Sequence, residues 1–440
     1  MPLPMFCDQC EQTNATTGAC TTIGVCGKDP DVQSLQEILL YGLKGVAAYA
    51  HHARRLGQVD EEIDAFTEEA LFATVTNVNF DIPTLLEMVL QCGMINLKAM
   101  DLLDRGHVQR FGQPAVTKVF HGTKAAPGIL ITGHDMLDLW NLLEVCRAAG
   151  TDVLVYTHGE MLPAHMYPKL REHPNLAGHF GGPWQVQRRE FADFAGPILA
   201  TTNCVQIPTD KYRDRIFTTR CTAVPGGVRI VNDDFGPVVV KAKAIGALPA
   251  RVENVPDVPI GFHHSVVLGL ADTIVQAVKA GQISRFFVIG GCDGAEPGRN
   301  YFSEYASHTP KDSFILTCGC GKYRINNVDH GTHLGLPRLL DMGQCNNAFG
   351  AIQVAVGLAK AFNCGVNDLP LTIVLSWFEQ KAVAVLLTLL ALGVKGIRVG
   401  PRPPAFVSPN VFKVLQDKFD LKLTTGDWQA DLAEAVGTKH

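Results

Sequence analysis

The fold of this chain is decided by stretches such as Arg285-Phe-Phe-Val-Ile-Gly-Gly-Cys-Asp-Gly294. Its short apolar run ends on two glycines, a pattern that predicts a buried β-strand running into a tight turn. Cys292 stands in that turn. Open α/β sheets bind their ligands beside the carboxyl ends of the strands. A thiol in this position is therefore a candidate binding residue.

The same pattern recurs along the chain, each time with a metal-capable side chain at or just after a predicted strand end. Cys292 has six such companions: His134, Glu160, Cys204, Cys320, Cys345 and Glu379. Parallel sheets gather strand ends at one edge, so we expect these seven side chains to lie together. Taken singly, each has a plainer interpretation, as a small buried cysteine or as a glutamate at a helix start.

The chain of 440 residues is long enough for several domains. Residues 1–111 show helical periodicity after a cysteine-rich loop and predict a helical bundle. Strands then alternate with helices over short loops, which predicts doubly wound α/β domains over 112–260 and 261–440. The predicted fold class is therefore multidomain α/β.

Several helices can be located from apolar spacing. Ser34-Leu-Gln-Glu37 predicts a capping box at the start of the first helix. Further helices are predicted over 60–76, 83–103 and 265–281. The longest apolar run, 382–394, is too short to cross a bilayer and predicts a buried helix.

Composition excludes some partners. A net charge of −5 with 18% charged residues gives no indication of nucleic acid or of an anionic membrane as a partner. The first residues lack the basic and apolar regions of a signal peptide, so we expect a cytoplasmic protein. The 13 cysteines are an odd number, which argues against a disulfide framework and for metal or redox chemistry.

Four of these cysteines form the motif Cys7-x2-Cys10-x9-Cys20-x5-Cys26. The loop between them has too little apolar content to fold alone, so we expect a metal at its centre. Four thiolates suit zinc or an iron–sulfur cluster. An iron–sulfur cluster is favoured over zinc, because other cysteines downstream also stand at predicted strand ends, where they could bind metal. The spacing matches neither standard ferredoxin pattern, so spacing leaves the cluster type open.

The second set of candidates mixes four thiols with an imidazole and two carboxylates. The harder ligands suit ferric iron with oxygen bridges, whereas the thiolates suit sulfur-bridged iron. A site with both would be a polynuclear iron centre that keeps a position open to a small substrate. The residues by themselves thus predict a redox metalloprotein with two metal sites.

The motifs resemble those of the hybrid-cluster proteins, also called prismane proteins or hydroxylamine reductases. The resemblance covers essentially the whole chain. It rests on the four N-terminal cysteines and on the motifs Gly133-His134-Asp135, Tyr156-Thr-His-Gly-Glu160-Met-Leu-Pro, Thr202-Asn-Cys204, Gly291-Cys292-Asp-Gly, Cys320-Gly-Lys-Tyr-Arg, Gly343-Gln-Cys345-Asn and Trp377-Phe-Glu379-Gln-Lys381. It implies a helical domain followed by two Rossmann-like domains. Longer members carry two helical bundles, and this chain has room for one, so it resembles the short form.

The resemblance also implies the cofactors. The seven residues around Cys292 would ligate a hybrid cluster of the [4Fe-2O-2S] type, with a persulfide on Cys292. Cys7, Cys10, Cys20 and Cys26 would hold a [4Fe-4S] cluster, because their spacing is close to that of members with this cluster. A [2Fe-2S] cluster is the alternative.

The activity that the resemblance implies is reduction of small nitrogen species. Hydroxylamine would be reduced to ammonia and water, nitric oxide would be a second substrate, and an electron-donor protein would deliver electrons through the N-terminal cluster. His134, Glu160 and Glu379 would be the ligands most able to shift. Lys381 is a candidate for proton supply or charge balance, or else a surface lysine. His158 is a similar candidate, and a structural role in orienting other groups is the favoured alternative for it. The oligomeric state stays open.

The residues leave two other functions open. Cys292 could sense nitric oxide, or pass a nitrosyl or sulfur group to other proteins. A carbon monoxide dehydrogenase-like activity would need nickel, and the two glutamates argue against it.

Overall fold

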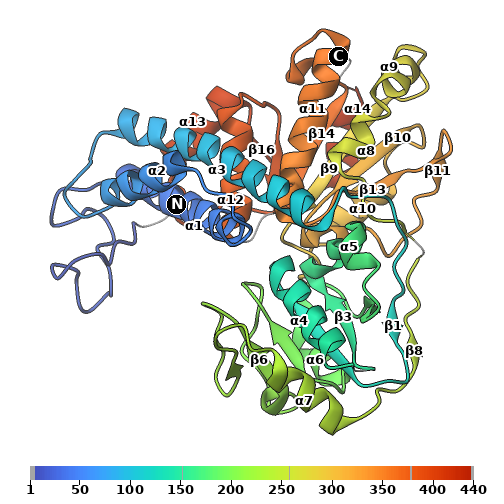
Figure 1. Cartoon of the computed structure of the whole chain (residues 1–440). Coiled ribbons are helices and arrows are strands. Elements are labelled where there is room, and N and C mark those ends of the chain that lie inside the picture. Colours follow the sequence, from blue (N-terminus) through green and yellow to red (C-terminus); the bar gives the residue numbers. More distant parts are fainter. Residues whose placement is uncertain (1–4, 151, 257, 377–378, 438–440) are drawn as a thin grey trace. The chain divides into compact units, whose positions relative to one another are not determined.

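The computed structural model describes residues 5–150, 152–256, 258–376 and 379–437. The chain divides into two compact units: unit 1 joins Met1–Gly106 to Phe362–His440, and unit 2 is His107–Ala361 (Figure 1). Parallel strands with helices between them occur in both units, which confirms the predicted multidomain α/β class.

Unit 1 combines the N-terminal helices with the C-terminal part of the chain. Its elements are α1 (Pro30–Arg55), α2 (Glu61–Ala73), most of α3 (Ile82–Phe111), η6 (Val366–Asp368), β14 (Leu371–Ser376), α12 (Gln380–Ala391), β15 (Arg398–Gly400), α13 (Pro409–Phe419), β16 (Lys422–Leu423) and α14 (Trp428–Gly437). Strands β14, β15 and β16 pair in parallel in that order.

Helix α1 begins at Pro30, earlier than the capping box predicted at Ser34. The Asp29 side chain accepts a hydrogen bond from the Val32 N–H at 2.8 Å, and proline is favoured in the first turn. Ser34 lies inside the helix, where its hydroxyl accepts a hydrogen bond from the Ser408 N–H at 2.9 Å. The capping-box prediction was wrong because Asp29-Pro30 is a stronger start signal upstream.

Helix α12 packs on α1 and α3 through glycines. A Cβ atom at Gly45 of α1 would lie 2.5 Å from the Ala384 Cβ, and one at Gly93 of α3 would lie 2.2 Å from the Leu387 carbonyl oxygen. Thr388 donates a hydrogen bond from its hydroxyl to the Gly93 carbonyl at 2.8 Å. The buried helix predicted from the longest apolar run is therefore confirmed, and it completes the helical bundle.

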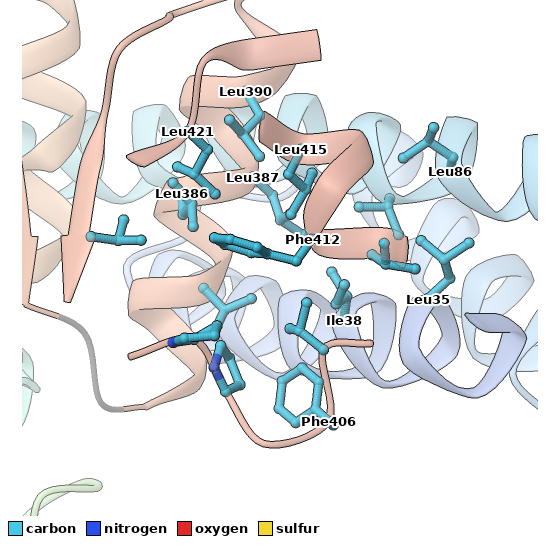
Figure 2. Close-up of a pocket in the computed structure, with 17 residues that line it drawn as sticks. Leu35, Ile38, Leu86, Leu386, Leu387, Leu390, Phe406, Phe412, Leu415 and Leu421 are labelled. Carbon is cyan, nitrogen blue, oxygen red and sulfur yellow. The ribbon is translucent and has the colours of Figure 1, made fainter. Parts of the chain in front are cut away.

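An apolar cavity of about 50 Å³ lies in unit 1 (Figure 2). Leu35 and Ile38 of α1 line it together with Leu387 of α12 and Phe412 and Leu415 of α13. Its walls carry only apolar side chains and prolines, so the cavity offers no hydrogen-bond partner to water. Hydrophobic packing therefore holds the two ends of the chain together in this unit.

Unit 2 begins with a six-stranded parallel sheet in the order β4-β3-β2-β5-β6-β7. Its elements are β1 (Gly122–Thr123), β2 (Gly128–Thr132), α4 (Met136–Ala148), β3 (Leu154–His158), η1 (Gly159–Met166), α5 (Pro168–Arg171), β4 (Leu176–His179), η2 (Trp184–Val186), α6 (Gln187–Asp193), β5 (Ile198–Ala200), η3 (Arg213–Arg215), β6 (Ile216–Thr218), β7 (Val228–Arg229), α7 (Gly236–Ile245) and β8 (Arg251–Val252). Tyr156 of β3 forms one buried hydrophobic cluster with Phe191 and Phe194, which lie outside the strands of this sheet.

The second part of unit 2 carries the parallel strands β13-β10-β9. Its elements are α8 (His264–Leu268), α9 (Ala271–Lys279), β9 (Arg285–Gly291), α10 (Tyr301–Ser307), β10 (Ser313–Thr317), η4 (Cys320–Arg324), β11 (Thr332–His333), β12 (Leu336–Pro337), β13 (Leu339–Asp341), η5 (Cys345–Asn347) and α11 (Ala348–Phe362). The helix predicted over 265–281 is thus split in two at Gly269-Leu270.

The two units group the chain differently from the predicted segments 1–111, 112–260 and 261–440, because α12 packs with α1 and α3. The three-domain division stays a prediction. Among the described residues, no helix combines the length and the apolar character that a membrane span requires.

Candidate metal centre

Six of the predicted ligands lie in unit 2, and each follows a parallel strand within four residues. They are His134 after β2, Glu160 after β3, Cys204 after β5, Cys292 after β9, Cys320 after β10 and Cys345 after β13. The carboxyl ends of parallel strands are where α/β proteins place their ligands. The strand-end positions expected from the sequence are therefore present.

Unusual backbone geometry marks several of these strand ends. Gly133 directly precedes His134, and Gly291 directly precedes Cys292. Their φ values are 110° and 126°, which residues with a side chain rarely adopt. A Cβ atom at Gly133 would also lie 2.4 Å from the Thr201 hydroxyl oxygen. Cys204 itself has a φ of 67°. Such conformations are held in place by surrounding structure and concentrate at functional sites.

Three of the predicted ligands converge on one point. His134, Glu160 and Cys345 each offer one ligand atom, and these atoms all lie within 4.8 Å of one another. His134 and Glu160 are buried. An imidazole, a carboxylate and a thiol directed at the same point form a donor set that fits iron and other transition metals.

Gln344 holds this group of ligands in place, and its role was not foreseen from the sequence. Its side-chain amide donates hydrogen bonds to the carbonyl of His134 at 3.2 Å and to that of Glu160 at 2.6 Å. The Cys345 N–H donates to the Glu160 carboxylate at 2.9 Å, and the Thr202 hydroxyl lies 2.9 Å from the His134 Nδ1. Contacts of this kind orient metal ligands. The only sequence signal was the position of Gln344 directly before Cys345.

Two of the other predicted thiol ligands, Cys204 and Cys320, interact electrostatically with this group. Burial raises the pKa of the Cys320 thiol well above its ordinary value, and the charges of Glu160, Cys204 and Cys345 raise that pKa further. Burial likewise raises the pKa of Cys318 to about 12. Several acidic ligands crowded in a buried space repel one another when they ionise, and a bound cation would relieve that repulsion. The residues present therefore fit a metal cluster.

Cys292 is buried in a turn that neighbouring side chains fix from both ends. Its carbonyl accepts hydrogen bonds from the Trp184 indole N–H at 3.3 Å and from the Gln185 amide at 3.1 Å. The next residue, Asp293, accepts from the Arg324 guanidinium at 2.7 Å. At Gly294, two residues after Cys292, an added Cβ atom would lie 2.6 Å from the Cys320 carbonyl oxygen. The turn of Cys292 therefore packs directly on the segment of Cys320.

A buried lysine lies behind these ligands. Lys322 is fully buried, and its ammonium donates hydrogen bonds to the Asp341 carboxylate at 2.9 Å and to the Gly343 carbonyl at 2.7 Å. Burial alone would lower the pKa of Lys322, but Asp341 and Glu160 outweigh burial and raise that pKa. The positive charge of Lys322 therefore offsets the negative charges of Asp341 and Glu160.

His158 makes contacts through both of its ring nitrogens, and its orienting role stays a prediction. Its Nδ1 lies 3.1 Å from the Thr132 hydroxyl, and its Nε2 lies 2.9 Å from the Glu190 carboxylate. Both ring nitrogens are therefore engaged by protein groups. Glu379 and Lys381 lie in unit 1, as the N-cap and second residue of α12, and Lys381 is buried. Their part in the same site as the six residues of unit 2 stays a prediction.

The N-terminal cysteine loop lies in unit 1. Cys7 and Cys20 face each other across two backbone hydrogen bonds of 3.2 and 2.9 Å. The Lys28 ammonium is fully buried and lies 3.8 Å from the Cys7 sulfur. No cysteine of the described chain is in a disulfide. The Cys7 thiol beside a buried cation is suited to act as a thiolate ligand.

Residues 5–89 and 81–433 match the model of the Prismane/CO dehydrogenase family. The matched residues include the four N-terminal cysteines and all the predicted ligands of the second site. The chain belongs to the Prismane/CO dehydrogenase family. Membership confirms the resemblance to the prismane proteins that the motifs indicated.

Relatives in this family occur in two lengths. A hydroxylamine reductase of Moorella thermoacetica is 57% identical over 433 residues, which are 98% of this chain and 100% of the relative. One of Thermotoga maritima is 48% identical over 434 residues and is also fully covered. One of Rhodospirillum rubrum is 53% identical over 405 residues, which are 72% of its length. This chain thus has the length of the shorter relatives.

Solved structures of carbon monoxide dehydrogenases share the fold. Carbon monoxide dehydrogenase IV from Carboxydothermus hydrogenoformans superposes with a TM-score of 0.81 at 14% identity, covering 99% of this chain and 92% of that one. The enzyme from Thermococcus sp. AM4 superposes with a TM-score of 0.77 at 17% identity, covering 99% of this chain and 90% of that one. At such low identity the likeness concerns the fold alone.

Proposed function

We propose that this chain is an iron–sulfur oxidoreductase that reduces hydroxylamine to ammonia and water, with nitric oxide as a second candidate substrate. The observation that carries the proposal is the 57% identity, over 98% of the chain, to a relative named hydroxylamine reductase. The convergence of His134, Glu160 and Cys345 within 4.8 Å supports it, because the reaction needs a redox metal with an open position.

The proposed cofactors are a [4Fe-4S] cluster on Cys7, Cys10, Cys20 and Cys26, and a hybrid [4Fe-2O-2S] cluster. The ligands proposed for the hybrid cluster are His134, Glu160, Cys204, Cys292, Cys320, Cys345 and Glu379, with a persulfide on Cys292. When bound, the hybrid cluster would supply a Lewis-acidic iron for the substrate and the electrons for its reduction.

The protein's own groups prepare this site. The Gln344 amide and the Cys345 N–H fix the backbone and the carboxylate of Glu160, so that its oxygen is presented at one point. The buried Lys322 ammonium offsets the charge of Glu160 and Asp341. A fixed ligand shell of this kind lowers the reorganisation that catalysis requires. Lys381 is proposed as the proton source or charge balance beside Glu379.

The reduction of hydroxylamine consumes two electrons and two protons and yields one ammonia and one water. An electron-donor protein supplies the electrons through the N-terminal cluster. The test is turnover of hydroxylamine by anaerobically prepared, fully metallated protein with dithionite as the reductant, with ammonia measured as the product. Iron and acid-labile sulfide are counted in the same preparation.

Two results would overturn the proposal. Fully metallated protein that consumes neither hydroxylamine nor nitric oxide would contradict the enzymatic function. Nickel present in stoichiometric amount would instead favour a carbon monoxide dehydrogenase-like centre.

A further inference from the structure

Unit 1 exposes an unusual number of large apolar side chains between α2 and α3. Phe72 is 65% exposed, Val75 50% and Phe80 41%. The same short stretch also exposes Leu71, Val78 and Ile82. Isolated exposed apolar residues are common, but a contiguous group of this kind marks an interaction site.

The N-terminal cysteine loop adds to this apolar surface. Phe6 and Val25, each directly before a cysteine, are 62% and 68% exposed. The Thr76 hydroxyl lies 3.5 Å from the Gln9 carbonyl, which places the segment between Cys7 and Cys10 beside the α2–α3 connection. The exposed apolar residues of the loop and of the connection therefore belong to one region, which we call the cysteine-loop face.

The charged side chains of the two segments that form this face are all acidic. Neither residues 5–27 nor residues 56–97 contain a lysine or an arginine. Glu68 and Glu69 are exposed one turn before Phe72, and Asp8 and Glu11 are exposed on either side of Cys10. Among the ion pairs of the described residues, none involves any of these four carboxylates. They are therefore available to a partner.

An apolar centre with carboxylates around it is complementary to a partner surface that has basic residues around an apolar patch. The four carboxylates would attract and orient the lysines and arginines of such a partner. Contact between the two apolar patches would then stabilise the complex. A second copy of this chain would bring the same carboxylates against one another, and like charges facing each other oppose association.

We propose that the cysteine-loop face docks a basic electron-carrier protein and brings its redox centre close to Cys7 and Cys10. This inference rests on the proposed function, in which electrons enter through the N-terminal cluster. It adds the location of the docking surface and the charge of the partner.

The test uses the metallated protein and oxidised mitochondrial cytochrome c, a lysine-rich one-electron carrier, as the partner. Its matched control is the same cytochrome c with its lysines succinylated. Binding is measured by isothermal titration calorimetry at low and at physiological ionic strength. Native cytochrome c should bind at low salt, with an affinity that falls about tenfold or more at physiological salt, and the succinylated form should not bind.

The variant Glu68→Lys/Glu69→Lys should weaken this binding about tenfold or more. Lysines near the carboxyl end of α2 suit the helix dipole, so this variant should fold. The matched control is Asp210→Lys/Asp214→Lys, which reverses two carboxylates of unit 2 that are 91% and 75% exposed. That control should bind cytochrome c as the unaltered protein does. Phe72→Ser should weaken binding without changing its salt dependence.

Equal binding of native and succinylated cytochrome c would overturn the proposal, and so would unchanged binding by the Glu68→Lys/Glu69→Lys variant. A concentration-dependent dimer in sedimentation that Phe72→Ser dissociates would assign the face to a second copy instead. Hydroxylamine turnover with dithionite bypasses the face and should be equal in all variants. Loss of that turnover in the unaltered protein would contradict the proposed function while leaving the binding result intact.

Discussion

The ammonium group of Lys28 lies 3.8 Å from the sulfur of Cys7, and the lysine side chain is fully buried. Gln33 holds the same ammonium group through its side-chain oxygen at 3.1 Å. A positive charge kept out of water beside a thiolate favours the more negative, reduced state of any cluster that the thiolate holds. We therefore expect Lys28 to ease the reduction of a cluster held at the N-terminal site.

Replacing Lys28 with methionine should make the midpoint potential of the N-terminal cluster more negative, by roughly 60 mV, or about 1.4 kcal/mol for one electron. Lys28→Arg keeps the charge and should leave the potential near its original value. The measurement is a redox titration of the cluster followed by electron paramagnetic resonance. An equal potential in the methionine variant would show that the ammonium group has no electrostatic role.

The Gln344 contacts predict a selective effect on the second site. Gln344→Leu removes both donors to the His134 and Glu160 carbonyls but keeps the volume of the side chain. Turnover of hydroxylamine should fall about 10- to 100-fold, and the signal of the proposed hybrid cluster should change, because its proposed ligands are no longer oriented. The N-terminal cluster signal should stay the same.

The control for this experiment is Gln416→Leu, an exposed position on α13. It should leave both cluster signals and turnover unaltered. Full activity with an unchanged hybrid signal in Gln344→Leu would mean that the amide only fills space.

The membership of Glu379 in the ligand set can be tested separately. Glu379→Ala removes a carboxylate at the N-cap of α12. The electron paramagnetic resonance of the proposed hybrid cluster should change, and that of the proposed N-terminal cluster should not. An unchanged hybrid signal would remove Glu379 from the set of ligands.

The contact between α3 and α12 makes a prediction about stability. A methyl group at Gly93 would lie 2.2 Å from the Leu387 carbonyl oxygen, which belongs to the backbone and cannot rotate away. Gly93→Ala should therefore destabilise the protein by about 1–3 kcal/mol, as overpacking does. Thermal unfolding of the variant should begin several degrees lower.

Gly437→Ala is the matched control, because a Cβ atom at Gly437 would meet nothing within 4 Å. It should unfold at the temperature of the unaltered protein or slightly above it. Equal stability of Gly93→Ala would show that the two helices can move apart without cost.

Local sequence signals predicted much of the candidate site. An apolar run that ends on glycine describes a strand and its turn within a few residues, so β9 and the position of Cys292 could be located from the sequence. The same holds for His134 after β2 and for Glu160 after β3. The helix start at Pro30 was missed only because a second, weaker capping pattern lies one turn later.

Contacts between distant segments carried no such signal. The packing of α12 on α1 and α3 joins the two ends of the chain. The apolar periodicity of each helix predicts that it has a buried face but does not predict which other helix covers that face. The same is true of the Gln344 amide, whose two acceptors lie 184 and 210 residues away along the chain.

Residue type and a few neighbouring residues were enough to locate the side chains of metal-capable type and the strand end that six of them follow, because these properties are local. The convergence of His134, Glu160 and Cys345 within 4.8 Å, and the burial of Lys28 against Cys7, became visible only in the folded chain. Distances of this kind depend on how separate segments pack, and packing is set by the whole core.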